Sequence, residues 1–176
     1  MRVPVELSHS ARLRAAVDRY GERELVERAA GLLRTGEEDD DFLRYLGGRA
    51  APGIIDGSYP SYWANAWGAR ALEYYWLDSA TGAVIAGLDH EHWRVRMQCA
   101  RVCAIRELGA PELLAALLLD ENWRVRDATA WAVGIVGEFE HAEPLREATD
   151  DPHKKVRERA TTVLDALLHR LERELD

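Results

Sequence analysis

The chain has 176 residues and a net charge of −8, from 23 Lys and Arg residues against 31 Asp and Glu residues. This length is typical of one structural domain, and an apolar share of 47% excludes a disordered chain. The acidic balance disfavours a general binder of nucleic acids or anionic membranes, since both need a basic surface. Lys154 and Lys155 are the only lysines, which is typical of a GC-rich bacterial genome.

The first 58 residues show no repeat. Helical patterns end at Gly21 and Gly36, because glycine favours the end of a helix. The acidic run of residues 37–41 is interpreted as a solvated loop, with a docking site for a basic partner as the alternative. The elements predicted here are helices at 8–20, 22–34 and 42–46, followed by a loop at 47–60.

Three copies of one pattern follow, with a period near 30 residues. They are centred on Val95, Val125 and Val156, each followed by an arginine. Residues four, seven and eight positions after each valine are small or apolar, with one threonine. These offsets face one side of a helix, so each copy is predicted as an amphipathic helix. The stripe comprises Cys99, Val102 and Cys103, then Thr129, Ala132 and Val133, and finally Ala160, Val163 and Leu164.

Shorter apolar helices are predicted between the copies. Asp120 and Asp151 stand ahead of the second and third repeated helices as N-cap candidates, and Pro152 suits the first helical position. The repeating unit is therefore a helix, a turn and a second helix. The shorter helices are expected at residues 80–88, 111–119 and 142–149, and a less regular unit at 62–76.

The segment Leu-Leu-Asp120-Glu-Asn-Trp-Arg-Val-Arg126, with spaced alanines and Gly137 after it, resembles the short HEAT-like repeat, also called the phycobilisome-lyase repeat. The resemblance covers about residues 60–176, and the stretch 46–96 also resembles small, uncharacterised actinobacterial HEAT-repeat proteins. It implies an all-α fold, a right-handed α-solenoid of helix pairs. We expect residues 1–58 to form an N-terminal helical cap and residues 59–176 to form about three and a half repeats, in one structural domain overall.

The repeated arginines have two interpretations. In HEAT-like repeats the equivalent arginine usually pairs with the loop aspartate of a neighbouring unit, and such aspartates are present here. We therefore favour a structural role over a ladder of ligand-binding arginines. The arginines are Arg96, Arg126 and Arg157, and the aspartates are Asp89, Asp120 and Asp151.

No catalytic, metal or cofactor site is expected. Cys99 and Cys103 fall in the apolar stripe, so they are predicted as buried, reduced core thiols and not as a metal or redox pair. The histidines lack metal-binding spacing, and no nucleophile–base order or glycine-rich phosphate loop is present. The N-terminus shows no secretory signal and no stretch is long enough to span a membrane, so we expect a cytoplasmic protein.

One candidate binding surface lies opposite the apolar stripe. Arg101 and Trp131 occur six residues after their repeat valines, at about 215° from the centre of the stripe, and Arg70 stands one unit earlier. Met97 and Asp127 occupy the second position after the valine. In the resembling family this helix lines a concave groove, and a tryptophan flanked by arginines is typical of an interface hot spot. The alternative is that Trp131 packs on the N-terminal segment.

The other tryptophans are interpreted separately. Trp93 and Trp123 occupy the same repeat position, which favours packing between repeats over a binding role. Trp63, Trp67 and Trp76 either seal the junction with the cap or lie in the floor of the groove; both interpretations stay open.

The sequence therefore predicts a non-catalytic HEAT-repeat interaction scaffold that binds a protein or peptide partner in its concave groove. The alternative is a HEAT-fold enzyme, either bilin lyase-like or DNA glycosylase-like. A glycosylase needs a cationic groove with an aromatic and an acidic residue, which Arg101, Trp131 and Asp127 imitate, but the net charge of −8 disfavours nucleic acid. A weaker alternative is an adaptor for a cationic metabolite or peptide. The oligomeric state is left open.

Overall fold

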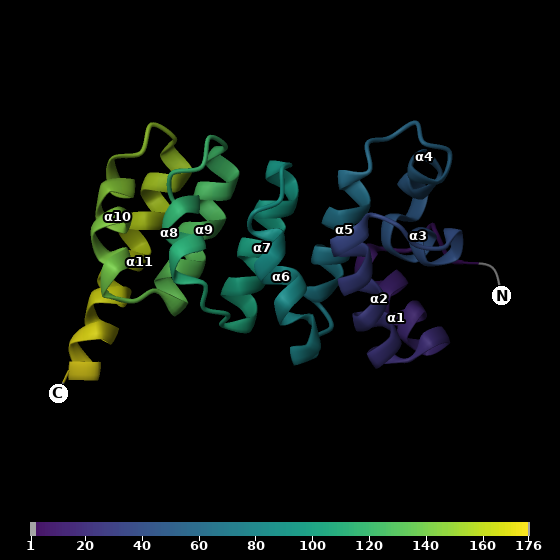
Figure 1. Ribbon diagram of the computed structural model, residues 1–176, viewed down its shortest axis with the longest axis horizontal. Coiled ribbons are helices and arrows are strands. Elements are labelled where there is room, and N and C mark those ends of the chain that lie inside the picture. The colour runs from purple at the N-terminus through teal and green to yellow at the C-terminus, as the bar shows by residue number, and fades with distance from the viewer. Residues whose placement is uncertain (1–2, 176) are drawn as a thin grey trace. The chain divides into compact units, whose positions relative to one another are not determined.

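The computed structural model describes residues 3–175, and every regular element in that range is helical (Figure 1). The predicted all-α fold class is confirmed. None of the described helices combines the length and the apolar character needed to cross a lipid bilayer. Contacts between Cα atoms divide the chain into two compact units, residues 1–87 and 88–176. This division differs from the boundary between residues 58 and 59 that the sequence predicts.

The described part of the first unit contains the three predicted N-terminal helices and three more. The Ser8 hydroxyl caps the first helix by accepting from the Ala11 N–H at 3.3 Å. The predicted loop at 47–60 is wrong in part, because a short helix begins within it at Ala51, with Pro52 in its first turn. The helices are α1 (His9–Tyr20), α2 (Glu22–Thr35), α3 (Asp40–Gly47), α4 (Ala51–Ile55), α5 (Tyr62–Leu72) and α6 (Thr81–Gly87), with 3₁₀ turns at Gly48–Ala50 and Asp78–Ala80.

Both α5 and α6 pack on α2, which explains why the division falls after residue 87. A Cβ added at Gly68 of α5 would lie 2.6 Å from the Ala29 carbonyl oxygen and 2.7 Å from the Leu33 nitrogen of α2. The buried Asn65 side chain also donates to the Leu33 carbonyl at 3.0 Å. These contacts place the less regular unit with the N-terminal helices, whereas sequence periodicity assigned it to the repeats. The expectation of a single domain overall stays a prediction.

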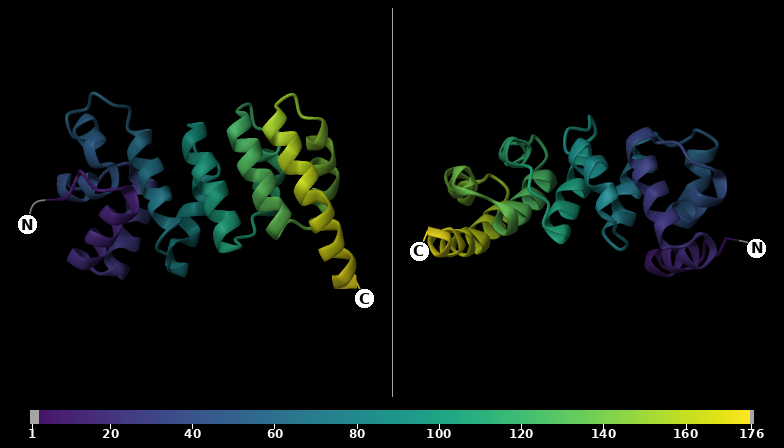
Figure 2. Two further views of the ribbon diagram at one scale, coloured as in Figure 1. Left: turned by 180° about the vertical axis from the view of Figure 1, so that it is seen from behind. Right: turned by 60° about the horizontal axis from the view of Figure 1, so that its bottom comes forward.

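The second unit carries the repeated helices side by side, with α9 between α7 and α11 (Figure 2). The repeat valines Val95, Val125 and Val156 are fully buried, as the stripe predicts. Gly134 allows α9 to approach α11, since a Cβ there would lie 2.5 Å from the Val163 side chain. The elements are α7 (Trp93–Arg106), α8 (Pro111–Leu117), α9 (Trp123–Val136), α10 (Ala142–Glu147) and α11 (Lys154–Leu175), with 3₁₀ turns at Phe139–His141 and Ala148–Asp150.

The predicted arginine–aspartate pairs join successive repeats. The Arg96 Nε lies 2.7 Å from an Asp120 carboxylate oxygen, and Arg126 donates twice to Asp151, from Nε at 2.6 Å and from Nη2 at 2.9 Å. Asp151 is buried, which by itself raises its pKa, but the hydrogen bonds from Arg126 and from the His153 N–H lower that pKa below the usual value. The predicted structural role is confirmed for Arg96 and Arg126. Arg157 makes a different contact, in which its Nη1 donates to the backbone carbonyl of Asp151 at 2.7 Å.

The same aspartates do not act as the predicted N-caps. The side chains of His92 and Asn122 cap α7 and α9, each by accepting from the N–H two residues later. Asp120 closes the turn just before the cap, where it accepts from the Asn122 N–H at 2.8 Å. Pro152 likewise precedes α11, which begins at Lys154, so its predicted place as the first helical residue is wrong. Asp120 and Asp151 thus shape the loops and pair across repeats at the same time.

Candidate functional site

The helices α7, α9 and α11 present one shared face, because each begins after the same kind of capped turn and keeps the same register around its buried valine. Positions −1, +2, +3 and +6 relative to that valine fall within an arc of about 100° on a helix with 3.6 residues per turn. Side chains at these positions in neighbouring repeats therefore project from the same side of the helix array.

An open hollow of about 410 Å³ lies on this face. Its volume is within the range of about 300–1,000 Å³ that ligand sites in proteins occupy. We call it the Trp131 hollow. It is lined by Met97 and Arg101 of α7, by Trp123, Arg124, Asp127, Ala128 and Trp131 of α9, and by Lys155 and Arg159 of α11.

Trp131 is half-buried and has arginines from both neighbouring repeats beside it. The guanidinium carbons of Arg101 and Arg159 each lie 5.9 Å from the centre of the Trp131 ring. This distance is within the range of a cation–π interaction. The Arg159 Nε is also 3.3 Å from Asp127 Oδ1, so a carboxylate of α9 orients the arginine that α11 supplies.

A second aromatic group borders the hollow at Trp123. The His153 ring stacks on it with centroids 3.8 Å apart and planes inclined by 6°. The Arg124 guanidinium lies 4.4 Å from the Trp123 centroid and 5.5 Å from that of Trp93 in the preceding repeat. The Lys155 amine is 5.4 Å from the Trp123 centroid. Trp93 and Trp123 thus contact residues of the following repeats, in keeping with the packing interpretation.

The charge of the hollow differs from the charge of the chain. Arg101, Arg124, Lys155 and Arg159 contribute four positive charges to its lining, against the single negative charge of Asp127. The acidic side chains on this face are themselves paired, since Asp127 lies 3.3 Å from Arg159 and Glu158 lies 3.3 Å from Lys154. The lining is locally basic although the chain is acidic overall.

Four of the five residues predicted for the groove line this hollow, namely Met97, Arg101, Asp127 and Trp131. Arg70 belongs to α5 of the first unit, where its charge contributes to the low pKa of His9. Sequence reasoning missed the cations at positions −1 and +3, because it followed only positions +2, +6 and +9. The omitted positions fall on the same arc of the helix, and they hold Arg124, Lys155 and Arg159.

Another open hollow, of about 320 Å³, occurs in the same unit beside the loops that hold the arginine–aspartate pairs. Leu119 in its lining is an apolar side chain that is 74% exposed. Asp120, Arg126 and Asp151 line it, but their charged groups are already engaged in the pairs between repeats. The structure thus commits these three side chains to holding the repeats together.

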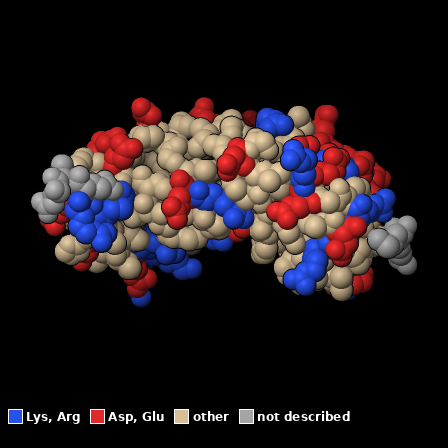
Figure 3. Space-filling model, turned by 90° about the horizontal axis from the view of Figure 1, so that it is seen from below, with Lys and Arg blue, Asp and Glu red and all other residues tan. Residues whose placement is uncertain are grey.

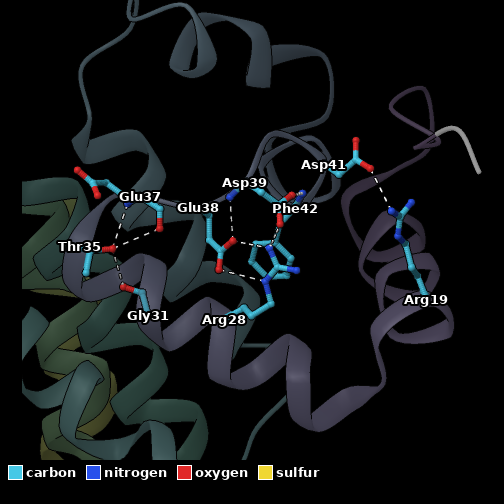
Figure 4. A network of polar contacts seen from close by, with 9 residues as sticks. All are labelled: Arg19, Arg28, Gly31, Thr35, Glu37, Glu38, Asp39, Asp41 and Phe42. Atoms are coloured by element: carbon cyan, nitrogen blue, oxygen red, sulfur yellow. Dashed lines mark hydrogen bonds and ion pairs between the residues drawn. The ribbon is translucent and has the colours of Figure 1, made fainter.

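The acidic run of residues 37–41 is tied into the first unit by ion pairs (Figure 4). Glu38 and Asp39 both accept from Arg28, and Asp41 lies 3.1 Å from Arg19. An Asp39 oxygen also caps α3 by accepting from the Phe42 N–H at 2.9 Å. The predicted solvated loop is confirmed in part, because residues 37–39 form no regular element and Glu37, Asp39 and Asp40 are exposed. It is wrong for Asp40 and Asp41, which belong to α3.

The cysteines and histidines occupy core or packing positions. Cys99 and Cys103 are fully buried free thiols, as predicted. Burial raises the pKa of both, that of Cys103 to about 12. Burial and the charges of Arg70 and Arg12 lower the pKa of His9 to about 4. Within the part of the chain that the structure describes, no group of three or more His, Cys, Asp or Glu residues is arranged to hold a metal ion.

Part of the chain matches a family of known proteins. Residues 83–165 match the family model of HEAT repeats, which is 83 of the 176 residues and just under half of the chain. The matched segment contains α7 to α10 and the first half of α11. It therefore includes every residue that lines the Trp131 hollow. No curated protein has a sequence that matches the chain.

Proposed function

We propose that the chain is a non-catalytic interaction protein whose HEAT-like repeats bind a protein or peptide partner in the Trp131 hollow. The observation that carries the proposal is Trp131 itself, which lines an open hollow with Arg101 and Arg159 on either side. Tryptophan and arginine are the residues most enriched at interface hot spots. The match to HEAT repeats, which often serve as protein-interaction modules, supports the same conclusion.

The chemistry of the lining supports binding over catalysis. Among the described residues that line the hollow, Asp127 is the single carboxylate, and its oxygen accepts from Arg159. General acid–base catalysis commonly needs a histidine or a second carboxylate poised beside the first. The hollow instead combines aromatic faces with positive charges, which suits the recognition of a ligand.

Affinity capture and quantitative binding test the proposal together. The purified chain is used to capture partners from an extract of its host cells, and a captured protein is then purified and titrated calorimetrically. Trp131→Ala is expected to weaken its binding at least tenfold, because a central tryptophan contributes about 2 kcal/mol or more. Phe139→Ala is the matched control, since Phe139 is 56% exposed in the same unit and outside the lining. A partner that binds Trp131→Ala and wild type equally well does not use this hollow.

A second candidate is a DNA glycosylase-like enzyme, and the basic lining is the observation that favours it. The hollow contains the aromatic, acidic and cationic groups that a glycosylase needs, namely Trp131, Asp127 and the surrounding arginines and lysine. The test is the release of a base from alkylated duplex DNA, compared between the wild type and Asp127→Asn. If the wild type releases the base and Asp127→Asn does not, the chain is an enzyme and the binding proposal is wrong.

A further inference from the structure

We propose that the chain has a further binding surface at Leu119, which takes a partner segment that carries an apolar side chain next to a lysine or arginine. The surface is the hollow of about 320 Å³ beside the loop between α8 and α9 and the loop between α10 and α11 (Figure 1). We call it the Leu119 hollow. It shares no lining residue with the Trp131 hollow, so the inference does not depend on the proposed function.

Leu119 is exposed at a position that the other repeats fill with aspartate. Its side chain is 74% exposed, although its backbone is fixed just after α8, where its N–H donates to the Ala116 carbonyl at 3.1 Å. The residues at the same distance before the repeat valine are Asp89 and Asp150, both exposed. The repeat therefore folds with an aspartate here, and the leucine supplies apolar area that a partner can bury.

The wall of the hollow next to Leu119 is also apolar. Pro144 of α10, Ala148 of the 3₁₀ turn after it and Pro152 of the loop before α11 line the hollow together with Leu118. The volume is at the lower end of the range of about 300–1,000 Å³ that ligand sites occupy. The hollow thus suits a short apolar contact with a partner.

The shape of the hollow is fixed by the contacts that join the repeats. Arg126 binds the Asp151 carboxylate and also donates to the Asp120 carbonyl at 2.8 Å. Arg157 donates to the carbonyls of Asp151 and Pro152, at 2.7 and 3.1 Å. Both loops are therefore held before a partner arrives, which reduces the entropy that binding costs.

The lining keeps an acidic excess after its ion pairs are counted. Two of its carboxylates belong to the pairs between repeats, so arginines already neutralise them. Its other two carboxylates are those of Glu147 and Asp150, which are exposed and form no ion pair with any residue that the structure describes. Charge complementarity across an interface selects the partner, and here it selects a cationic side chain.

The chemistry of this surface favours a basic peptide segment over nucleic acid or a metal ion. The phosphates of a nucleic acid would meet the carboxylates of Glu147 and Asp150, and duplex DNA needs cations along an extended track. On the face that Figure 3 draws, Lys and Arg side chains lie interspersed with Asp and Glu side chains. Among the described residues, no group of three or more His, Cys, Asp or Glu is arranged to hold a metal ion. A lysine or arginine can instead reach a carboxylate while its stem and its apolar neighbour cover Leu119.

Selection from a displayed library of random 12-residue peptides tests this inference, with the wild-type chain and Leu119→Asp as immobilised baits. This substitution introduces the residue that the other two copies hold at the position. Because Leu119 is exposed, we expect Leu119→Asp to melt within about 3 °C of the wild type by circular dichroism. A loss of peptide binding by Leu119→Asp then reports on the surface and not on folding.

Three further baits test the charge and the identity of the hollow. Glu147→Lys/Asp150→Lys reverses the acidic excess, and Glu147→Gln/Asp150→Asn replaces it if the reversal does not fold. Glu140→Lys is the matched control, since Glu140 is exposed in the turn before α10 and lies outside the lining. Trp131→Ala removes the anchor of the other hollow.

The wild type is expected to enrich, at least tenfold over the unselected library, peptides that place Lys or Arg next to Leu, Ile, Met or Phe. Glu140→Lys and Trp131→Ala should retain these peptides, because neither substitution touches the Leu119 hollow. Leu119→Asp and the double variant should each bind them at least tenfold more weakly.

Four results would overturn the inference. The first is that no enriched peptide binds the wild type better than Leu119→Asp, and the second is that the Leu119-dependent peptides lack Lys and Arg. The third is a dimer of the wild type in sedimentation velocity that Leu119→Asp abolishes, because a second copy then occupies the hollow. The fourth is enrichment only of peptides that depend on Trp131, which leaves the proposed function standing.

Discussion

The ion pair between Arg126 and Asp151 allows a quantitative test of how strongly successive repeats are held together. Replacing Asp151 by alanine leaves the Arg126 guanidinium without its two carboxylate contacts at 2.6 and 2.9 Å. It also removes the acceptor for the His153 N–H at 2.7 Å, which shapes the turn before α11. The change therefore breaks a contact between repeats and a contact within the loop.

The magnitude follows from burial. Breaking a buried ion pair by removing one partner costs about 3–5 kcal/mol, and losing the hydrogen bond in the turn adds about 1 kcal/mol. The side chain of Arg126 is 13% exposed, and its Nη1 still donates to the Asp120 carbonyl at 2.8 Å, so part of its charge stays solvated and bonded. We therefore expect Asp151→Ala to lower the free energy of unfolding by roughly 2–4 kcal/mol.

Urea unfolding followed by circular dichroism measures this loss. Asp150→Ala is the control, because Asp150 is exposed next in the chain, and its loss should change stability by less than about 0.5 kcal/mol. Since the Asp151 pKa is lowered on folding, its stabilisation is present above the usual aspartate pKa and is lost as the pH falls through the folded value. The gap between wild type and Asp151→Ala should thus narrow below about pH 4. A cost under about 1 kcal/mol at neutral pH refutes the reasoning and reduces the pair to an ordinary surface contact.

Three further substitutions test the packing. Gly68→Ala should destabilise the first unit by about 2 kcal/mol or more in a urea titration, because the added Cβ would meet the backbone of α2. The control is Gly31→Ala on α2, where a Cβ meets open space, and it should stabilise the unit by up to about 1 kcal/mol. Cys103→Val should cost less than about 1.5 kcal/mol by thermal melting, and native-state labelling of both cysteines by a thiol reagent should be slow because they are buried and their pKa is raised. Glu107→Gly should raise the melting temperature by relieving a left-handed residue with φ of 55° at the end of α7, and no gain would indicate that the Glu107 side chain contributes there.

The repeated helices could be predicted closely because the same apolar offsets recur three times. Each copy reduces the chance that the pattern is accidental, and Val95, Val125 and Val156 are all fully buried. The aspartates could be assigned to pairing but not to their local role. Asp120 and Asn122 are both good N-cap residues, and only the backbone geometry shows which of them caps α9.

The first unit was harder to predict, since its contacts join segments that share no sequence pattern. Gly68 fits against α2 because it has no side chain to meet the backbone of Ala29 and Leu33, and nothing in the periodicity of α5 indicates this. The acidic run appeared solvated because its arginine partners, Arg19 and Arg28, stand outside it on α1 and α2. The basic character of the hollow was missed for a related reason, since a net charge averages over the surface and hides a local excess.

The central claim is that a partner binds in the Trp131 hollow, and mapping of the bound partner by two-dimensional ¹H–¹⁵N NMR tests it most directly. The isotopically labelled chain is titrated with the partner protein that affinity capture identifies, and the Trp131 indole signal is assigned through Trp131→Phe. The account predicts that the largest shifts fall on that indole and on the backbone of Arg101, Asp127 and Arg159. Shifts that centre instead on Leu119 and the loops before α9 and α11, with the Trp131 indole unmoved, would contradict it.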